Sequence, residues 1–127
     1  MWIKRLTVLL LLTLIVVLAG CDGLDNMGGR TVGLGDHSIQ FVNNTNMRIC
    51  YIYASPSSSS SWGADWLGDT GVINANESFT IRIMISDVYD LMAVLESTSG
   101  ECDGNGQQIT NTGFKIEGDQ TWSVTTE

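Results

Sequence analysis

The chain has 127 residues, 43% of them hydrophobic and 16% charged, and a formal net charge of −8. This length suits one small domain with a single hydrophobic core. Only six lysines and arginines stand against fourteen aspartates and glutamates, whereas proteins bind nucleic acids and anionic lipid surfaces through clustered basic side chains. The composition therefore argues against a nucleic-acid partner and favours a small, acidic, well-solvated domain.

The first twenty-one residues, MWIKRLTVLLLLTLIVVLAGC, are typical of an export signal. Lys4 and Arg5 precede an apolar run, Leu6–Leu18, of about the length of a signal-peptide core and short of a comfortable membrane span. The run ends in the tetrapeptide Leu18-Ala19-Gly20-Cys21, whose small residues before the cysteine let a peptidase close on the backbone. This tetrapeptide resembles the lipobox of bacterial lipoproteins.

The resemblance implies a signal peptide over residues 1–20 and a mature N-terminus at Cys21, whose sulfur carries the lipid (diacylglycerol, palmitate). It also implies attachment to the extracytoplasmic face of a bacterial membrane. The alternative is an uncleaved membrane anchor, because the apolar stretch with Met1–Ile3 approaches the twenty residues that a spanning helix needs. Removing Lys4 and Arg5 with the leader leaves four basic and fourteen acidic residues, 4 − 14 = −10.

The next segment, residues 21–37, is predicted to be a lipidated flexible tether. From Asp22 to His37 it reads DGLDNMGGRTVGLGDH, with five glycines, no aromatic residue and no apolar period. Glycine-rich chains of this kind behave as flexible coils. Met27 and His37 are interpreted as incidental tether residues rather than ligands.

Residues 38–127 show the two-residue period of β-strands. Phe79, Ile81 and Ile83 alternate with polar or exposed positions, and Trp122 and Val124 do the same near the end of the chain. About six strands are expected, separated by Asn, Gly, Ser and Asp clusters that favour turns. Their ranges are 38–43, 47–53, 79–85, 88–95, 109–116 and 121–125.

These strands predict an all-β fold, a small antiparallel two-sheet sandwich, with a small open barrel as the alternative. The runs over 47–53 and 88–95 are the richest in apolar residues and are expected to be central strands. In the first of them, Met47, Ile49, Tyr51 and Tyr53 are expected to share one face.

Once Cys21 carries lipid, Cys50 and Cys102 remain, and two cysteines in a small exported domain predict a disulfide. Closing a loop of this length stabilises a domain by about 4 kcal/mol on the chain-entropy model. The pair is expected to tie the two halves of the domain together. No metal site and no cofactor are expected, since the spacing of cysteine and histidine fits no ligand motif.

The longest irregular segment, SPSSSSSWGADWLGDT over residues 55–70, carries the candidate binding residues. Trp62 and Trp66 are spaced so that two indole faces would stack on a sugar or aromatic ligand, with Asp65 and Asp69 accepting hydrogen bonds from its hydroxyls. The competing interpretation makes the Trp62–Leu67 turn a lid that plugs one end of the sandwich, with the indoles as part of the core.

Two further clusters are interpreted structurally. The segment ECDGNGQ over residues 101–107 has some features of a calcium loop, but it lacks the fixed acidic positions and fits a plain turn as well. The pairs Asp65 with Asp69 and Asp87 with Asp90 would be needed for acid–base catalysis, yet all four lie among turn signals. The chain is therefore not expected to be an enzyme.

A second likeness lies in the folded part. The series FVNNT, ICYIYASP, SWGADWLGD, YDL and CDGN is similar to an uncharacterised bacterial exported β-domain. The resemblance implies a β-sandwich and transfers no activity. We therefore expect a lipid-anchored cell-envelope protein acting as a binding or structural module, with the membrane and an envelope protein or glycan as partners. The alternative function is a carbohydrate-binding domain that uses Trp62 and Trp66.

Overall fold

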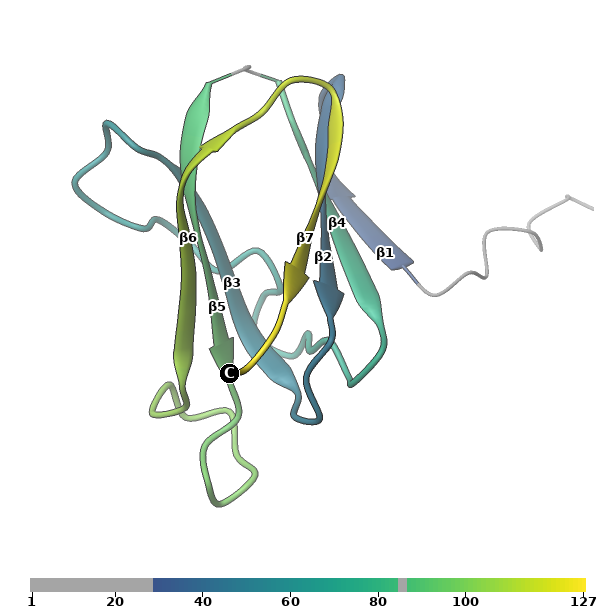
Figure 1. Cartoon of the computed structure of the whole chain (residues 1–127), viewed down its shortest axis with the longest axis vertical. Coiled ribbons are helices and arrows are strands. Elements are labelled where there is room, and N and C mark those ends of the chain that lie inside the picture. Colours follow the sequence, from purple (N-terminus) through teal and green to yellow (C-terminus); the bar gives the residue numbers. More distant parts are fainter. Residues whose placement is uncertain (1–28, 85–86) are drawn as a thin grey trace, which may run out of the picture.

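The computed structural model describes residues 29–84 and 87–127, and within them the chain forms two packed β-sheets (Figure 1). The predicted all-β sandwich is confirmed. The described residues contain seven strands and no helix. The strands are β1 (Gly29–Gly33), β2 (His37–Asn43), β3 (Ile49–Pro56), β4 (Ser78–Ile83), β5 (Val88–Leu95), β6 (Gln108–Lys115) and β7 (Asp119–Val124).

The four-stranded sheet has the order β1-β4-β2-β7. Its antiparallel centre pairs β2 with β4, with Phe41 opposite Phe79 and Ile39 opposite Ile81. The alternation of apolar and polar residues predicted for β4 is confirmed, because Phe79, Ile81 and Ile83 are buried. Strand β1 pairs with β4 at one edge and β7 pairs with β2 at the other, and both of these pairs are parallel.

Strand β1 corrects the prediction of a flexible tether over residues 21–37. Residues 29–33 pair in register with β4, and His37 begins β2. The sequence gives no local sign of β1, since its GRTVG is short and rich in glycine. The strand exists because β4 offers it a parallel partner, which is a contact distant in sequence. The predicted leader and the first part of the predicted tether, residues 21–28 with Cys21 and Met27, lie outside the described residues.

The three-stranded sheet has the order β3-β5-β6, and all its pairs are antiparallel. Strand β5 is central as expected, but β3 lies at the edge. A second correction concerns the faces of β3: a register shift between Ile49 and Tyr51 leaves Cys50 as an extra residue. Since one extra residue exchanges the two faces of a strand, Ile49 and Ile52 are fully buried in the core whereas Tyr51 and Tyr53 are not.

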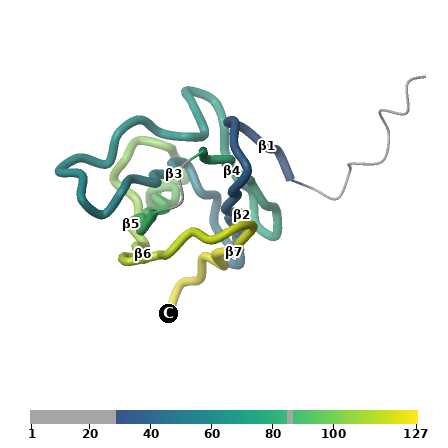
Figure 2. The backbone as a smooth tube through the Cα atoms, turned by 90° about the horizontal axis from the view of Figure 1, so that it is seen from above, coloured from purple at the N-terminus to yellow at the C-terminus, as the bar shows by residue number. Residues whose placement is uncertain are grey.

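The core lies between the two sheets, which Figure 2 shows from above as two adjoining layers. Strand residues supply most of it, and the connections add Leu67, Ile73 and Ile116, all almost fully buried. A polar residue, Asn43, is also fully buried. Its amide Nδ2 donates to the carbonyls of Met47 and Ile73 at 2.8 and 2.9 Å, and its Oδ1 accepts from the backbone N–H and the hydroxyl of Thr45. Asn43 is therefore a satisfied hub that joins three segments.

The predicted disulfide between Cys50 and Cys102 is confirmed, with 5.4 Å between the Cα atoms. The expected tie between two halves of the domain is instead a link within one sheet. Cys50 is the extra residue of β3, and Cys102 lies in the connection from β5 to β6, so the bond closes the end of the three-stranded sheet rather than crossing to the other sheet. It fixes the β5–β6 connection against β3.

Candidate functional site

The segment that carries the two tryptophans lies along the free edge of β3. The backbone N–H of Trp66 donates to the carbonyl of Ile52 at 2.9 Å. The Asp65 carboxylate accepts from the backbone N–H of Ile52 at 2.8 Å and from that of Leu67 at 3.0 Å. An unpaired strand edge exposes backbone donors and acceptors to other chains. The segment therefore covers the middle of this edge and is itself held in place.

Asp65 thus has a structural role in the described fold. Burial raises the pKa of its carboxyl group, the amides of Ile52 and Leu67 act against this effect, and the nearby charge of Asp69 adds to it. Asp65 lines a hollow together with Trp62 and Trp66, whereas Asp69 is exposed and does not line it. The two carboxylates expected to act together on a ligand therefore have different surroundings. Asp65 accepts hydrogen bonds from the backbone of Ile52 and Leu67, and Asp69 is exposed to solvent.

Trp66 packs between the sheets. Its ring lies close to Gly33 of β1, since a β-carbon added at that glycine would be 3.3 Å from it, and the indole also packs against the hydrophobic core. Beside it, the Arg30 guanidinium donates to the Leu67 carbonyl at 3.3 Å and lies 5.3 Å from the centre of the Phe79 ring. Trp66 and Leu67 therefore close the gap between the edge strands β1 and β3, at the side of the sandwich rather than at the end where the lid interpretation placed them.

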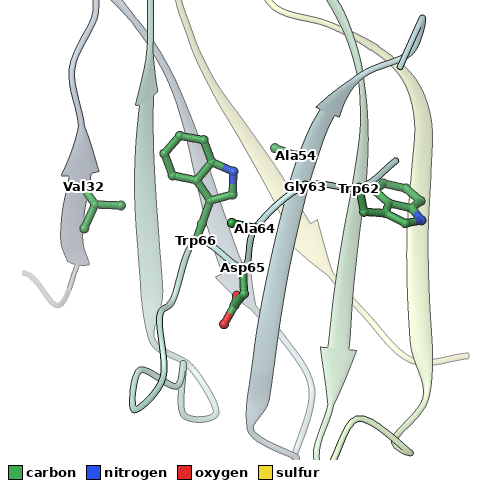
Figure 3. Close-up of a pocket in the computed structure, with 7 residues that line it drawn as sticks. All are labelled: Val32, Ala54, Trp62, Gly63, Ala64, Asp65 and Trp66. Atoms are coloured by element: carbon green, nitrogen blue, oxygen red, sulfur yellow. The ribbon is translucent and has the colours of Figure 1, made fainter. Parts of the chain in front are cut away.

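Trp62 lies on the other side of β3. A hollow of about 400 Å³ is lined by both tryptophans together with Val32, Ala54 and Asp65, but Figure 3 shows the two indoles on opposite sides of the β3 ribbon. Trp66 is on the side of β1, and Trp62 is on the side of β5 and β6. A spacing of four residues places two side chains on one face of a helix or of a strand, and this segment forms neither. The structure does not join the two rings into one stacking platform.

Trp62 instead forms one end of a groove on the outer face of the three-stranded sheet. The groove has a volume of about 460 Å³, within the range of small-molecule sites. We call it the aromatic groove, and its lining residues are Tyr51, Tyr53, Trp62, Met92, Val94, Gly104 and Gln108. Two of the rings come from β3 and the third from the segment that carries the tryptophans, and the aliphatic floor comes from β5.

The groove is a direct consequence of the extra residue in β3. Tyr51 pairs with Val94, and Tyr53 pairs with Met92, so each tyrosine lies beside an apolar residue of β5 on the same face. Met92 and Val94 are 7% and 4% exposed, so neighbouring side chains, including the tyrosines paired with them, cover most of this aliphatic floor. The sequence pattern put Tyr51 and Tyr53 on one face with Ile49, whereas Ile49 is buried in the core and the tyrosines lie on the opposite face, so the pattern did not reveal this site.

One end of the groove is fixed by polar contacts near the disulfide. The Tyr51 hydroxyl donates to the Cys102 carbonyl at 2.7 Å. In the same connection, the Asp103 carboxylate accepts the backbone N–H of Asn105 at 2.9 Å, which lowers the pKa of Asp103, and Gly104 has a φ of +81°. These are the contacts of a tight turn. Within the part of the chain that the structure describes, no three histidine, cysteine or acidic side chains gather as for a metal ion.

The second carboxylate pair also has structural partners. Asp90 accepts the Ser57 hydroxyl at 2.6 Å and the backbone N–H of Gly113 at 2.9 Å, and the pKa of Asp90 is lowered, most by Ser57. Gly113 lies where β6 has an extra residue against β5, with a φ of +72°. Asp87 accepts the backbone N–H of Val88. Asp90 thus joins the start of the tryptophan segment to β6.

His37, expected in the tether, is instead half-buried at the start of β2. Its Nδ1 accepts the backbone N–H of Gly118 at 3.0 Å.

In residues 29–84 and 87–127 there is no helix long and apolar enough to cross a membrane. No family model, curated protein or solved structure matches the chain.

Proposed function

We propose that the protein is an exported bacterial lipoprotein whose β-sandwich is a non-catalytic binding module at the extracytoplasmic face of the membrane. The observation that carries the binding role is the aromatic groove. Two tyrosines and a tryptophan gather on an outer sheet face, over a buried aliphatic floor. Aromatic side chains concentrated on a surface are typical of binding sites. The anchor itself rests on the resemblance of Leu18-Ala19-Gly20-Cys21 to a lipobox.

The disulfide supports the export half of this proposal. Bonds of this kind persist in oxidising compartments and are rare in the cytosol. Cys50 and Cys102 are bonded and close the end of the sheet that holds the groove. An extracytoplasmic location therefore supplies the redox conditions that the binding surface needs.

The carboxylates favour binding over catalysis. Those of Asp65 and Asp90 each accept two hydrogen bonds from neighbouring segments. Groups engaged in this way serve to hold loops in position and do not present a poised acid or base to a substrate.

The alternative, carbohydrate binding through Trp62 and Trp66, is retained in a changed form. Trp62 faces the groove, whereas Trp66 packs on the core side of β3. A ligand on the outer face of the sheet would therefore meet Trp62 with the tyrosines of β3.

Two experiments test the two halves of the proposal. For the anchor, bacteria producing the full chain are fed an alkyne analogue of palmitate, with Cys21→Ser as the matched control. We expect label on the parent protein and none on the variant, and equal label on both would contradict the anchor.

For the binding role, a diazirine photoreactive residue replaces either Thr110, an exposed residue of β6 that pairs with Met92 beside the groove, or Thr80 on the outer face of the other sheet, in the membrane-bound full chain. We expect a defined covalent adduct, resolved by mass spectrometry, at position 110 and not at position 80. Equal adducts at both positions, or none at either, would contradict a binding surface at the groove.

A further inference from the structure

We propose that the aromatic groove binds a neutral carbohydrate chain, with the rings of Trp62, Tyr53 and Tyr51 stacking against successive sugar units. This inference rests on the proposed binding function and specifies the ligand class of the same surface. Four features of the groove support a neutral carbohydrate: the arrangement of the rings, the charge around them, the polar groups beside them and the rigidity of the walls.

The rings form a row rather than a cluster. Tyr51 and Tyr53 are two residues apart on one strand face, which places them about 7 Å apart along β3. Trp62 extends the row at the other end, where it also borders a smaller hollow with Ser55 and Asp90. A row of flat apolar faces suits an extended ligand with repeated units better than one compact molecule.

The charge around the groove favours a neutral ligand. None of the seven lining residues carries a charge at neutral pH. Burial, followed by the nearby Asp65 and Tyr51, raises the pKa of Tyr53, so its phenol stays neutral. Asp90 borders the hollow beside Trp62. An anionic polymer would meet uncompensated negative charge here, with no basic side chain among the lining residues to bind it.

Polar groups beside the rings favour a hydroxyl-rich ligand over an acyl chain. The exposed side chain of Gln108 offers both an amide donor and a carbonyl acceptor, and Tyr53 offers a phenol hydroxyl. A saturated chain laid on these groups would remove them from water without replacing their hydrogen bonds, which is unfavourable. Sugar rings present apolar C–H faces to the aromatic rings and hydroxyls to the amide.

The groove is also held rigid before any ligand arrives. The disulfide and the Tyr51 hydroxyl fix the β5–β6 connection at one end. At the other end, the Asp65 carboxylate and the backbone of Trp66 hold the segment that carries Trp62 against β3. A site whose walls are already ordered loses less conformational freedom on binding.

The test is isothermal titration calorimetry of the full chain in a zwitterionic detergent, which brings no sugar headgroup. The probes are chitohexaose, cellohexaose and maltohexaose as neutral chains, polygalacturonate as the anionic counterpart, and palmitate as the acyl chain. Two variants remove a ring, Trp62→Ala and Tyr53→Ala. A third variant, Tyr53→Phe, keeps the ring and removes only the hydroxyl, and Thr80→Ala on the other sheet is the matched control outside the groove.

We expect at least one neutral hexasaccharide to bind, and the two ring-removing variants to raise its Kd about tenfold. Thr80→Ala should bind within about twofold of the parent, and Tyr53→Phe should raise the Kd less than Tyr53→Ala because it keeps the stacking ring. Thermal unfolding of each variant separates lost rings from lost folding. Binding of palmitate or polygalacturonate with no binding of the neutral chains would overturn the inference. An adduct at position 110 in the photolabelling experiment with no binding of any neutral chain would reject the sugar ligand and leave the binding module standing. Failure of both experiments would reject both proposals.

Discussion

The outer faces of the two sheets differ sharply, although the same alternation of side chains produces both. On the four-stranded sheet, the register aligns Thr31, Thr80, Gln40 and Thr121 in one polar row across β1, β4, β2 and β7. On the three-stranded sheet, the corresponding face carries Tyr51 and Tyr53 over Val94 and Met92. An unbroken two-residue period yields an ordinary solvated face, and one extra residue in β3 yields an aromatic surface.

Tyr51 and Tyr53 owe their outward position to the same residue that forms the disulfide. They lie outside because Cys50 interrupts the period and bonds to Cys102. The staple and the display of the rings therefore have one structural origin.

The largest expected effect comes from removing the staple. The double variant Cys50→Ala with Cys102→Ala should lower the free energy of unfolding by about 4 kcal/mol, because the closed loop of 52 residues no longer restricts the unfolded chain. Chemical denaturation of the full chain measures it, with Cys21→Ser as the control for loss of a cysteine. A double variant as stable as the parent would show that the disulfide does not support the sheet.

The four-stranded sheet depends on a hydrogen-bond hub in place of a covalent bond. Asn43→Ala should lower the free energy of unfolding by about 3 kcal/mol, because four buried or part-buried hydrogen bonds, to the carbonyls of Met47 and Ile73 and from the N–H and hydroxyl of Thr45, would be lost. The exposed neighbour Asn44, changed to Ala, is the matched control and should have little effect. Equal effects of the two substitutions would contradict the role of Asn43.

A pH series separates the two carboxylates that hold the edge segments of the three-stranded sheet. The pKa of Asp65 is raised, so its share of the stability should be lost as the pH rises through that pKa, and Asp65→Asn should remove this loss. The pKa of Asp90 is lowered, so its share should be present above the ordinary value and lost as the pH falls through the folded-state pKa. Melting temperatures between about pH 2 and pH 7 measure both. If Asp65→Asn and Asp90→Asn altered the pH dependence of the melting temperature in the same direction, these assignments would be contradicted.

The smallest effect should come from the polar face. Thr80→Val should change the free energy of unfolding by no more than about 0.5 kcal/mol, because Thr80 lies in the outer row of a sheet whose core face is unaffected. Denaturation under the same conditions as for the other variants measures it. A loss of several kcal/mol would mean that this face is covered in the folded protein.

The sequence predicts the parts of the fold that depend on local pattern. The alternation of Phe79, Ile81 and Ile83 identifies a strand and its buried face, and the two remaining cysteines predict the disulfide. Strand β1 was not predictable in this way, since a glycine-rich segment becomes a strand only by pairing with β4, about fifty residues later. Nonlocal pairing leaves no periodic signal in so short a segment.

The candidate site was less predictable than the fold. Trp62 was expected to bind ligand, and it does line the aromatic groove, but its companions are Tyr51 and Tyr53 rather than Trp66. The cause is the register shift at Cys50, which the alternation alone does not reveal. The tyrosines on both sides of Ile52, within a strand that also contains a disulfide cysteine, were the one available sign that the period breaks there.

The outward position of the two tyrosines is tested most directly by their exposure in solution. In the full chain, with labelled tyrosine and phenylalanine rings, NMR relaxation by a soluble gadolinium chelate reports how close each ring lies to solvent. The account predicts strong broadening for Tyr51 and Tyr53 and little for Phe41 and Phe79, which are 0% and 2% exposed. Tyrosine rings as protected as those phenylalanines would place them in the core and contradict the account.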